Sequence, residues 1–281
     1  MALSAARALT KGRRAGAPLP DVEALSDLRD GYFRFRFRQS EVALIAGQPN
    51  AGKSLFALWL ASQFDVPTLY FSADSSSFTA STRLAAAYTG DATEKVAEGM
   101  RAGGAGYYEA VLDESPIRFC FDPNPTHTTI ADELDAWVER WDDWPRLVIV
   151  DNLMDVVGAG DSEFAAYKDV LLGLKTIARE TEAAILVLHH MSESGTDPFT
   201  PAPRKAVMGK ASQTPEHVLS IAMGEGGDEF RLSVVKHRNG PADPSGKKYI
   251  SLRALPDRCQ FEKWVPLAQP AVHPADGEWW K

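Results

Sequence analysis

Short apolar segments alternate with amphipathic segments through the middle of the chain, between residues 42 and 188. The apolar segments fit strands buried on both faces, and the segments between them carry apolar residues at helical spacing. This order is typical of a parallel sheet covered by helices on both sides. The pattern predicts strands at 42–46, 68–72, 117–121, 147–150 and 184–188, and helices at 53–64, 80–88, 130–141 and 164–181.

The pattern differs on either side of this region. Residues 21–28 have helical spacing and predict a short helix. Residues 33–38 alternate Phe and Arg, which predicts an edge strand with one apolar and one charged face, or alternatively a nucleic-acid surface. After residue 215 the pattern favours antiparallel hairpins, with strands at 218–223, 230–235 and 249–252. The fold class is therefore α/β, with a mostly parallel central sheet extended by C-terminal hairpins.

The same patterns divide the chain into three regions. Residues 1–29 form an N-terminal arm that includes the short helix, residues 30–264 form one α/β domain, and residues 265–281 form a tail. The tail ends in Glu278-Trp279-Trp280-Lys281, for which a partner-binding anchor and simple apolar packing are both open.

Composition narrows the function classes. Among 281 residues the net charge is -8, which argues against a protein that coats nucleic acid through bulk charge. Local basic tracks remain candidates, such as residues 11–14. No apolar run is long enough to span a membrane and no secretion signal precedes the domain, so we expect a cytoplasmic protein without a membrane partner. Cys120 and Cys259 lie in apolar segments and are expected to be buried thiols.

One loop carries a complete phosphate-binding motif. It follows the strand at 42–46, opens the helix at 53–64 and fits G-x-x-x-x-G-K-[ST] with Gly47, Gln48, Pro49, Asn50, Ala51, Gly52, Lys53 and Ser54. Backbone N–H groups and the helix N-terminus would cradle the phosphates of ATP. Lys53 would reach the β- and γ-phosphates, and the Ser54 hydroxyl would hold Mg²⁺.

Three further strands end in polar side chains that suit ATP hydrolysis. Asp151 ends the strand at 147–150 and is a candidate for the Mg²⁺ shell. Asp74 follows the strand at 68–72 and is the best candidate for the base that orients water, with a helix N-cap within residues 74–77 as the alternative. His190 follows the strand at 184–188 and is either a γ-phosphate sensor or an ordinary polar strand end.

A pair of cations stands near the C-terminal end of the domain, in Val234-Val235-Lys236-His237-Arg238-Asn239-Gly240-Pro241. Strand alternation places Lys236 and Arg238 on one face, and the Asn-Gly-Pro sequence then turns the chain. From the residues alone, two surface cations on a hairpin are an equal alternative to a role in catalysis.

The order of these motifs resembles the RecA-type ATPase core and, within it, the DnaB-type and RepA-type hexameric replicative helicases. The resemblance covers residues 30–264 and rests on the loop motif, on Asp74 followed by Arg83, on Asp151, on His190 and on the Lys-x-Arg hairpin. It implies a RecA-like P-loop fold, ATP and Mg²⁺ as cofactors, and a phage- or plasmid-like member without the family's N-terminal domain. The family base is usually Glu, so Asp74 is a departure by one methylene.

The resemblance also implies partners. In the family the hairpin cations act on the neighbouring subunit's γ-phosphate, so Lys236 and Arg238 are expected to act in trans within a homo-oligomer, which the resemblance suggests is a hexamer. The family loop after the sensor strand grips single-stranded DNA, which suggests Arg204, Lys205 and Lys210 here, although a disordered surface loop is an almost equal alternative.

The sequence therefore predicts an ATPase that acts as a ring-forming DNA helicase. Two alternatives remain. The first is a RecA-type recombination or strand-annealing ATPase that forms filaments or rings on single-stranded DNA. The second is a RecA-like regulatory ATPase with a protein partner and no nucleic acid, which the acidic composition keeps open.

Overall fold

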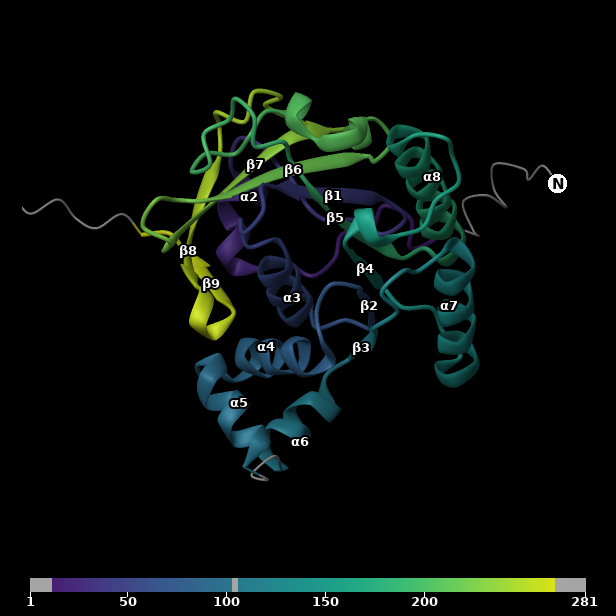
Figure 1. Ribbon diagram of the computed structural model, residues 1–281, viewed down its shortest axis with the longest axis vertical. Helices are drawn as coiled ribbons and strands as arrows, with labels where there is room; N and C mark the ends of the chain where they lie inside the picture. Colours follow the sequence, from purple (N-terminus) through teal and green to yellow (C-terminus); the bar gives the residue numbers. More distant parts are fainter. Residues whose placement is uncertain (1–11, 103–105, 266–281) are drawn as a thin grey trace, which may run out of the picture.

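A single mixed sheet forms the centre of the computed structural model, which describes residues 12–102 and 106–265. Within these residues the sheet has nine strands in the order β3-β2-β4-β5-β1-β6-β7-β8-β9 (Figure 1). The strands are β1 (Val42–Gly47), β2 (Thr68–Ser72), β3 (Ile117–Cys120), β4 (Leu147–Asp151), β5 (Ala184–His190), β6 (His217–Met223), β7 (Glu229–His237), β8 (Ile250–Leu255) and β9 (Gln260–Lys263). Strands β1 to β6 are parallel, and β7 to β9 are added antiparallel. This confirms the predicted fold class.

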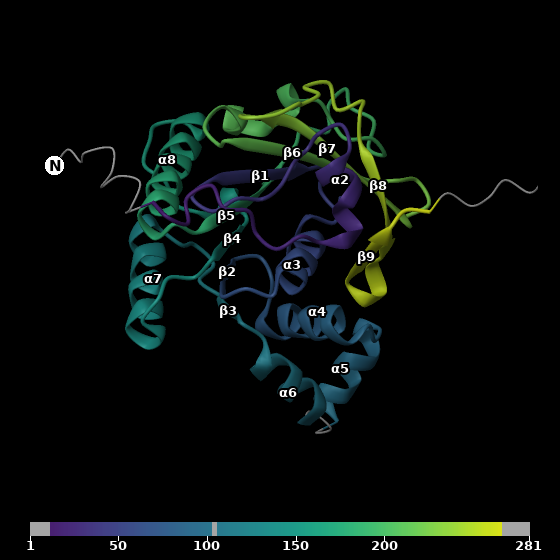
Figure 2. The same ribbon diagram turned by 180° about the vertical axis from the view of Figure 1, so that it is seen from behind.

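Helices cover both faces of the sheet, as the two-sided burial of β1 requires (Figures 1 and 2). The helices are α2 (Ser26–Asp30), α3 (Lys53–Phe64), α4 (Ser77–Thr89), α5 (Thr93–Arg101), α6 (Gly106–Glu114), α7 (His127–Trp141) and α8 (Glu163–Thr181). Ala43 and Ile45 of β1 pack into the cluster that contains α3 and α4, whereas Val42 and Leu44 pack into the cluster with α7 and α8. Alternation along one buried strand thus supplies two separate cores.

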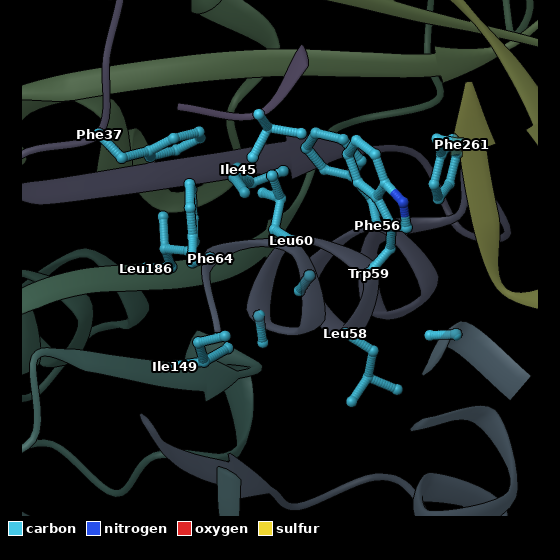
Figure 3. Close-up of a cluster of buried hydrophobic side chains, with 14 of the residues drawn as sticks. Phe37, Ile45, Phe56, Leu58, Trp59, Leu60, Phe64, Ile149, Leu186 and Phe261 are labelled. Atoms are coloured by element: carbon cyan, nitrogen blue, oxygen red, sulfur yellow. The ribbon is translucent and has the colours of Figure 1, made fainter. Parts of the chain in front are cut away.

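An aromatic cluster joins α3 to the C-terminal strands. Phe56 lies 4.8 Å from Phe230 of β7 and 5.4 Å from Phe261 of β9, measured between ring centroids. Trp59 lies 5.2 Å from the same Phe261 ring (Figure 3). Through these contacts the C-terminal strands pack against α3. The helix that begins at the phosphate-binding motif is therefore buried between the sheet and these strands.

Strand register decides which residues share an edge of the sheet. Gly47 at the end of β1 is in register with His190 of β5, and Ser72 of β2 is in register with Asp151 of β4. The carboxyl ends of these parallel strands therefore meet at one edge. β7 runs the other way, and its Lys236 pairs with Val218 at the start of β6, so the cations at its end lie at the opposite edge.

Several predicted elements differ from the structure. The segment 33–38 is not a strand, because Arg34 adopts a left-handed φ of 48°, and only an isolated bridge between Pro18 and Arg38 forms. Its alternation does hold: the side chains of Phe33, Phe35 and Phe37 are buried. The helix predicted at 21–28 is a 3₁₀ turn, η1 (Glu23–Leu25), followed by α2.

The helices α5 and α6 and the strand β9 were not predicted. In Figure 1, the helices α4, α5 and α6 lie together below α3, away from most of the sheet. The connection from β7 to β8 also differs from the short turn expected at Asn239–Pro241, because β8 begins only at Ile250. Lys11 of the basic N-terminal track and the Trp279-Trp280 tail lie outside the described residues. Over residues 12–102 and 106–265, no helix has both the length and the apolar character needed to cross a membrane.

Candidate nucleotide-binding site

The loop between β1 and α3 has the backbone of a phosphate cradle. Gly52 caps α3 with a φ of 82° and Asn50 has a φ of 62°, two left-handed conformations that turn the loop around the helix N-terminus. At Gly47 a Cβ atom would lie 2.8 Å from Cγ1 of Ile221, so only glycine fits between the loop and β6. Backbone N–H groups and the positive end of α3 are thereby directed at one site, which suits an anion.

Lys53 reaches back over this loop. Its Nζ atom donates to the carbonyl oxygens of Gly47, at 3.2 Å, and Gln48, at 3.0 Å. Burial lowers the pKa of Lys53 to about 8, and the nearby Asp151 carboxylate only partly offsets this effect. Because burial disfavours the charged form of this ammonium group, an anionic ligand beside it is strongly stabilising.

Asp151, at the end of β4, is held by a hydroxyl group. The buried Tyr70 hydroxyl donates to Oδ2 of Asp151 at 2.9 Å, and the nearby Ser54 side chain also favours the charged carboxylate. Burial raises the pKa of Asp151, although both hydroxyls and Lys53 act against it. Sequence reasoning missed Tyr70, which looks like any buried strand residue; only its register beside β4 reveals its role.

Asp74 and His190 join these groups along one cleft of about 1380 Å³. The negative charge of Asp74 acts on Asp151 and on His190. Ser76, not Asp74, caps α4, since its side chain accepts from the N–H of Thr79 at 3.2 Å. The helix N-cap expected within residues 74–77 is thus Ser76, which leaves the Asp74 carboxylate available to the cleft.

His189 and His190 point in opposite directions from β5. Burial and the charge of Lys53 lower the pKa of His190, so its imidazole is neutral at neutral pH in the cleft. His189 is completely buried and contacts the carbonyl oxygen of Met208 at 3.1 Å on the other side. The two histidines thus cannot share a metal, as expected from strand alternation.

The far wall of the cleft comes from α4 and α5. It carries Arg83, one of the residues on which the resemblance rests, and Arg101, whose guanidinium lies 4.8 Å from the Phe78 ring centroid. Arg101 was missed because α5 was not predicted. Two cations on this wall add to the attraction of the cleft for a polyanion.

The donor set fits ATP with Mg²⁺. The loop supplies N–H groups and Lys53 for phosphate oxygens, and Ser54 and Asp151 place two hard oxygen ligands next to each other, as Mg²⁺ prefers. Within the described residues no three His, Cys, Asp or Glu side chains form a group that could hold a metal ion by themselves, so Mg²⁺ would also need the Ser54 hydroxyl and phosphate oxygens. All eight residues of the predicted motif, with Asp74, Asp151 and His190, therefore lie around one edge of the sheet.

Lys236 and Arg238 lie away from this cleft. The Nη1 atom of Arg238 lies 3.3 Å from Oε1 of Glu216, and the Arg238 side chain is 59% exposed. Glu216 is buried and also contacts Lys175 at 2.7 Å. Lys236 contacts backbone carbonyls of its own chain. No described residue of the cleft contacts either cation.

The predicted DNA-binding residues share a groove of about 860 Å³ between residues 203–213 and 244–247. Arg204, Lys205 and Lys210 line it together with Lys247. Lys247 was missed by sequence reasoning because it lies in the connection between β7 and β8, about forty residues from the others in a segment expected to be a short turn. No acidic side chain lines this groove in the part of the chain that the structure describes.

The fold and the site together define a P-loop protein of the RecA-like fold. A family model described as the AAA domain matches residues 23–196, and the chain belongs to that family.

Two phage proteins are similar in sequence. The Gene 65 protein of Mycobacterium phage L5 is 34% identical over 256 residues, which cover 88% of this chain and 93% of that protein. The Gene 65 protein of Mycobacterium phage D29 is 34% identical over 229 residues, covering 78% and 98%.

Two solved structures have the same fold. One, described as an ATPase domain, has a TM-score of 0.71 at 17% identity, covering 92% of this chain and 96% of that one. The other, a DnaB-like replicative helicase solved for its interactions with primase, has a TM-score of 0.72 at 17% identity, covering 92% and 67%. The RecA-like core predicted from the motifs is thus the fold found in these two proteins.

Proposed function

We propose that the chain is an ATP-dependent motor that translocates on single-stranded DNA as a ring-forming, DnaB-like helicase. One observation carries the proposal: the cleft gathers the phosphate-binding loop, the candidate Mg²⁺ ligands and the candidate base of one chain, while Arg238 lies exposed at the opposite edge of the sheet. A cation placed there has a nucleotide target only on another copy of the chain. The ATPase domain and the DnaB-like helicase that share the fold support this choice of function.

In this proposal the residues of the cleft divide the work of hydrolysis. Lys53 and the loop N–H groups bind the β- and γ-phosphates, and Ser54 and Asp151 would hold Mg²⁺, which neutralises phosphate charge when bound. Asp74 accepts a proton from the attacking water and orients it. The neutral imidazole of His190 hydrogen-bonds to the γ-phosphate region and reports its presence to the segment that follows β5.

Arg238 completes the site of a neighbouring copy. Phosphoryl transfer spreads negative charge over the γ-oxygens, and a guanidinium supplied in trans accelerates it by about a thousandfold or more. Because Glu216 neutralises Arg238 in the isolated chain, assembly exchanges a carboxylate for a phosphate as its partner. Turnover then depends on an oligomer, for which we propose a hexamer.

Single-stranded nucleic acid is the proposed ligand of the basic groove. Four cations in a groove without acidic lining among the described residues suit a phosphate backbone and little sequence preference. Gln48 of the phosphate-binding loop donates from Nε2 to Oγ1 of Thr196 at 2.7 Å, within the segment that leads to the groove. Nucleotide and nucleic acid therefore contact one continuous segment.

The test is the ATPase rate against protein concentration, with and without single-stranded DNA. Arg238→Ala is expected to bind ATP normally and to lose turnover, and mixing it with Lys53→Ala chains is expected to restore part of the activity. Arg253→Ala, another exposed arginine on the adjacent strand β8, serves as the matched control and should behave as wild type. A wild-type rate that neither rises with concentration nor responds to DNA would contradict the proposal.

A further inference from the structure

Lys236 directs its ammonium group at its own chain. Its Nζ atom donates to the backbone carbonyls of Ser212 at 3.0 Å, Gln213 at 2.8 Å and Pro215 at 2.6 Å. An ammonium group has three N–H donors, so these contacts use all of them. In this arrangement no donor is left for a phosphate.

The acceptors belong to a helix end that needs such a cap. These carbonyls follow the last turn of η4 (Met208–Gln213), a kinked 3₁₀ segment in which Gly209 and Lys210 have left-handed φ angles of 56° and 54°, and carbonyls at the end of a helical turn lack partners inside it. Lys175 donates to the carbonyl of Thr214 at 3.2 Å, so two ammonium groups cap the four consecutive carbonyls of residues 212–215. Lys236 is therefore built into the local fold.

The capped segment forms one wall of the basic groove. Ser212 and Gln213 line the groove, and Lys210 precedes them on η4. Glu216, the next residue after the capped carbonyls, binds Arg238. Both cations of the Lys-x-Arg pair thus hold residues 212–216, Lys236 through the main chain and Arg238 through a side chain.

From these contacts we infer that Lys236 is a positioning residue of its own chain, which anchors the wall of the basic groove, and that Arg238 alone of the pair acts on the neighbouring nucleotide. The inference rests on the proposed function for the groove and for Arg238, and it replaces the trans role expected for Lys236. When Arg238 leaves Glu216 for a phosphate, one attachment of the segment is released while Lys236 keeps the other. The groove is thereby coupled to the subunit interface.

The anchoring is tested first without nucleotide or DNA, by hydrogen exchange of peptides covering residues 208–216. Lys236→Met is expected to speed exchange there by about tenfold, because the segment opens locally more often. Lys205→Met, which removes a groove charge but no cap, is the matched control and should leave exchange unchanged. Unchanged exchange in folded Lys236→Met would overturn the inference. Should that variant fail to fold, Lys236→Gln, which keeps two donors, is expected to show a smaller increase at the same residues.

The division of roles is tested with labelled oligothymidine and ATPase assays. Lys236→Met is expected to bind the oligonucleotide about fivefold more weakly and to keep its DNA-free ATPase rate within about twofold. Arg238→Met is expected to lose turnover and to weaken oligonucleotide binding less than Lys236→Met does, since Lys236 still anchors the segment. Mixing Lys236→Met with Lys53→Ala chains should raise oligonucleotide binding only by the share of intact grooves that the Lys53→Ala chains bring, since each groove lies within one chain. A loss of turnover in Lys236→Met that recovers on mixing would place Lys236 in the neighbour's site and overturn the inference.

The two proposals fail in different ways. If the wild-type chain neither hydrolyses ATP nor binds oligothymidine, the proposed function is wrong, and the proposed role of Arg238 is wrong with it. The hydrogen-exchange experiment still decides in that case whether Lys236 anchors residues 212–216. If the wild type is an active DNA-stimulated ATPase and Lys236→Met matches Arg238→Met in every assay, only the inference about Lys236 is wrong.

Discussion

The hydroxyl group of Tyr70 donates a 2.9 Å hydrogen bond to Oδ2 of Asp151, inside the sheet edge that carries the phosphate-binding loop. Tyr70 is almost completely buried and Asp151 nearly so, so water cannot replace this donor. The bond follows from the parallel pairing of β2 with β4, which brings the two side chains together. Tyr70 therefore fixes the orientation of the carboxylate that also contacts Ser54.

Tyr70→Phe should weaken the affinity of the nucleotide site for Mg²⁺. Without the hydroxyl, the buried carboxylate loses a donor, a change of about 1–3 kcal/mol for a charged acceptor, and its orientation is no longer fixed. We expect the Mg²⁺ concentration that half-saturates binding of a fluorescent ATP analogue to rise by about fivefold or more.

Tyr108→Phe is the control for this substitution. Tyr108 makes the same type of bond, from its hydroxyl to Oδ2 of Asp91 at 2.9 Å, but lies in α6 away from the cleft. It should change stability slightly and leave the Mg²⁺ titration unaltered. Equal effects of both variants would mean that Tyr70 contributes only to packing.

ATP affinity should fall at alkaline pH because of Lys53. Burial lowers the pKa of Lys53 in the free chain to about 8, compared with 10.5 for an ordinary lysine. ATP favours the charged form and raises this pKa, so binding above pH 8 requires proton uptake. The dissociation constant is expected to be flat below about pH 8 and to increase by up to about tenfold per pH unit above it.

Isothermal titration in buffers of different ionisation enthalpy measures this uptake directly. Lys53→Arg stays charged throughout the range and should have a flat pH profile, although its affinity will be lower. A wild-type profile that is also flat to about pH 9.5, roughly one and a half units above the pKa, would contradict the low pKa of Lys53.

Elements whose pattern lies within one short stretch of the chain could be predicted from the sequence. The loop motif, the strand end at Asp151 and the largely buried strands β1, β2, β4 and β5 are local patterns, and the parallel architecture follows from their order, whereas the parallel pairing of β6 with β1 was not predicted. The alternation in residues 33–38 predicted the right buried face but the wrong backbone. One residue, Arg34, takes a left-handed conformation that no side-chain pattern reveals.

Other features depend on contacts between distant residues. β9 is only four residues long and is held by Phe261 against Phe56 and Phe230, so its own sequence carries little strand signal. The partnership of Tyr70 with Asp151 depends on register between strands, and the place of Lys247 in the groove depends on a long connection. Such relationships become visible only once the chain is folded.

Phe261→Ala should cost substantial stability despite the shortness of β9. The Phe261 ring is 3% exposed and lies 4.7 Å from Phe230 and 5.2 Å from Trp59 between ring centroids. Emptying this position is expected to lower the free energy of unfolding by about 3–4 kcal/mol in urea denaturation. Phe199→Ala, at a 39% exposed position, should change it by about 0.5 kcal/mol or less. A loss below about 1 kcal/mol for Phe261→Ala would indicate that β9 does not close the core.

Glu216→Gln should destabilise the chain in a pH-dependent way. Burial opposes the charge of Glu216, but hydrogen bonds from Lys175 and from the Val42 N–H outweigh it and lower the pKa below the ordinary 4.5. A lowered carboxylate pKa contributes stability above pH 4.5 that is lost as the pH falls through the folded pKa. The variant is expected to lose about 2–3 kcal/mol at about pH 7, because it leaves Lys175 poorly paired.

The difference between wild type and Glu216→Gln should shrink as the pH falls below 4.5, the ordinary pKa of a glutamate. Urea denaturation at neutral pH and at successively lower pH measures it. Glu262→Gln, which removes the exposed partner of Arg253, is the control and should be nearly neutral at every pH. A Glu216→Gln penalty that is independent of pH would show that packing, not charge, is what the substitution removes.

Asp74→Asn and Ser76→Ala should separate catalysis from helix capping. Asp74 borders the cleft and acts electrostatically on Asp151 and His190, whereas the Ser76 side chain caps α4. Removing the carboxylate should lower the ATPase rate by about a hundredfold or more while ATP still binds, because an amide cannot accept the proton of the attacking water. Removing the cap should instead cost about 1 kcal/mol of stability and leave turnover close to wild type.

Asp74→Glu keeps a carboxylate one methylene further out and should retain turnover. ATPase rates, ATP-analogue binding and thermal melts on the three variants decide the matter, and an Asp74→Asn chain that hydrolyses ATP at the wild-type rate would remove Asp74 from the mechanism.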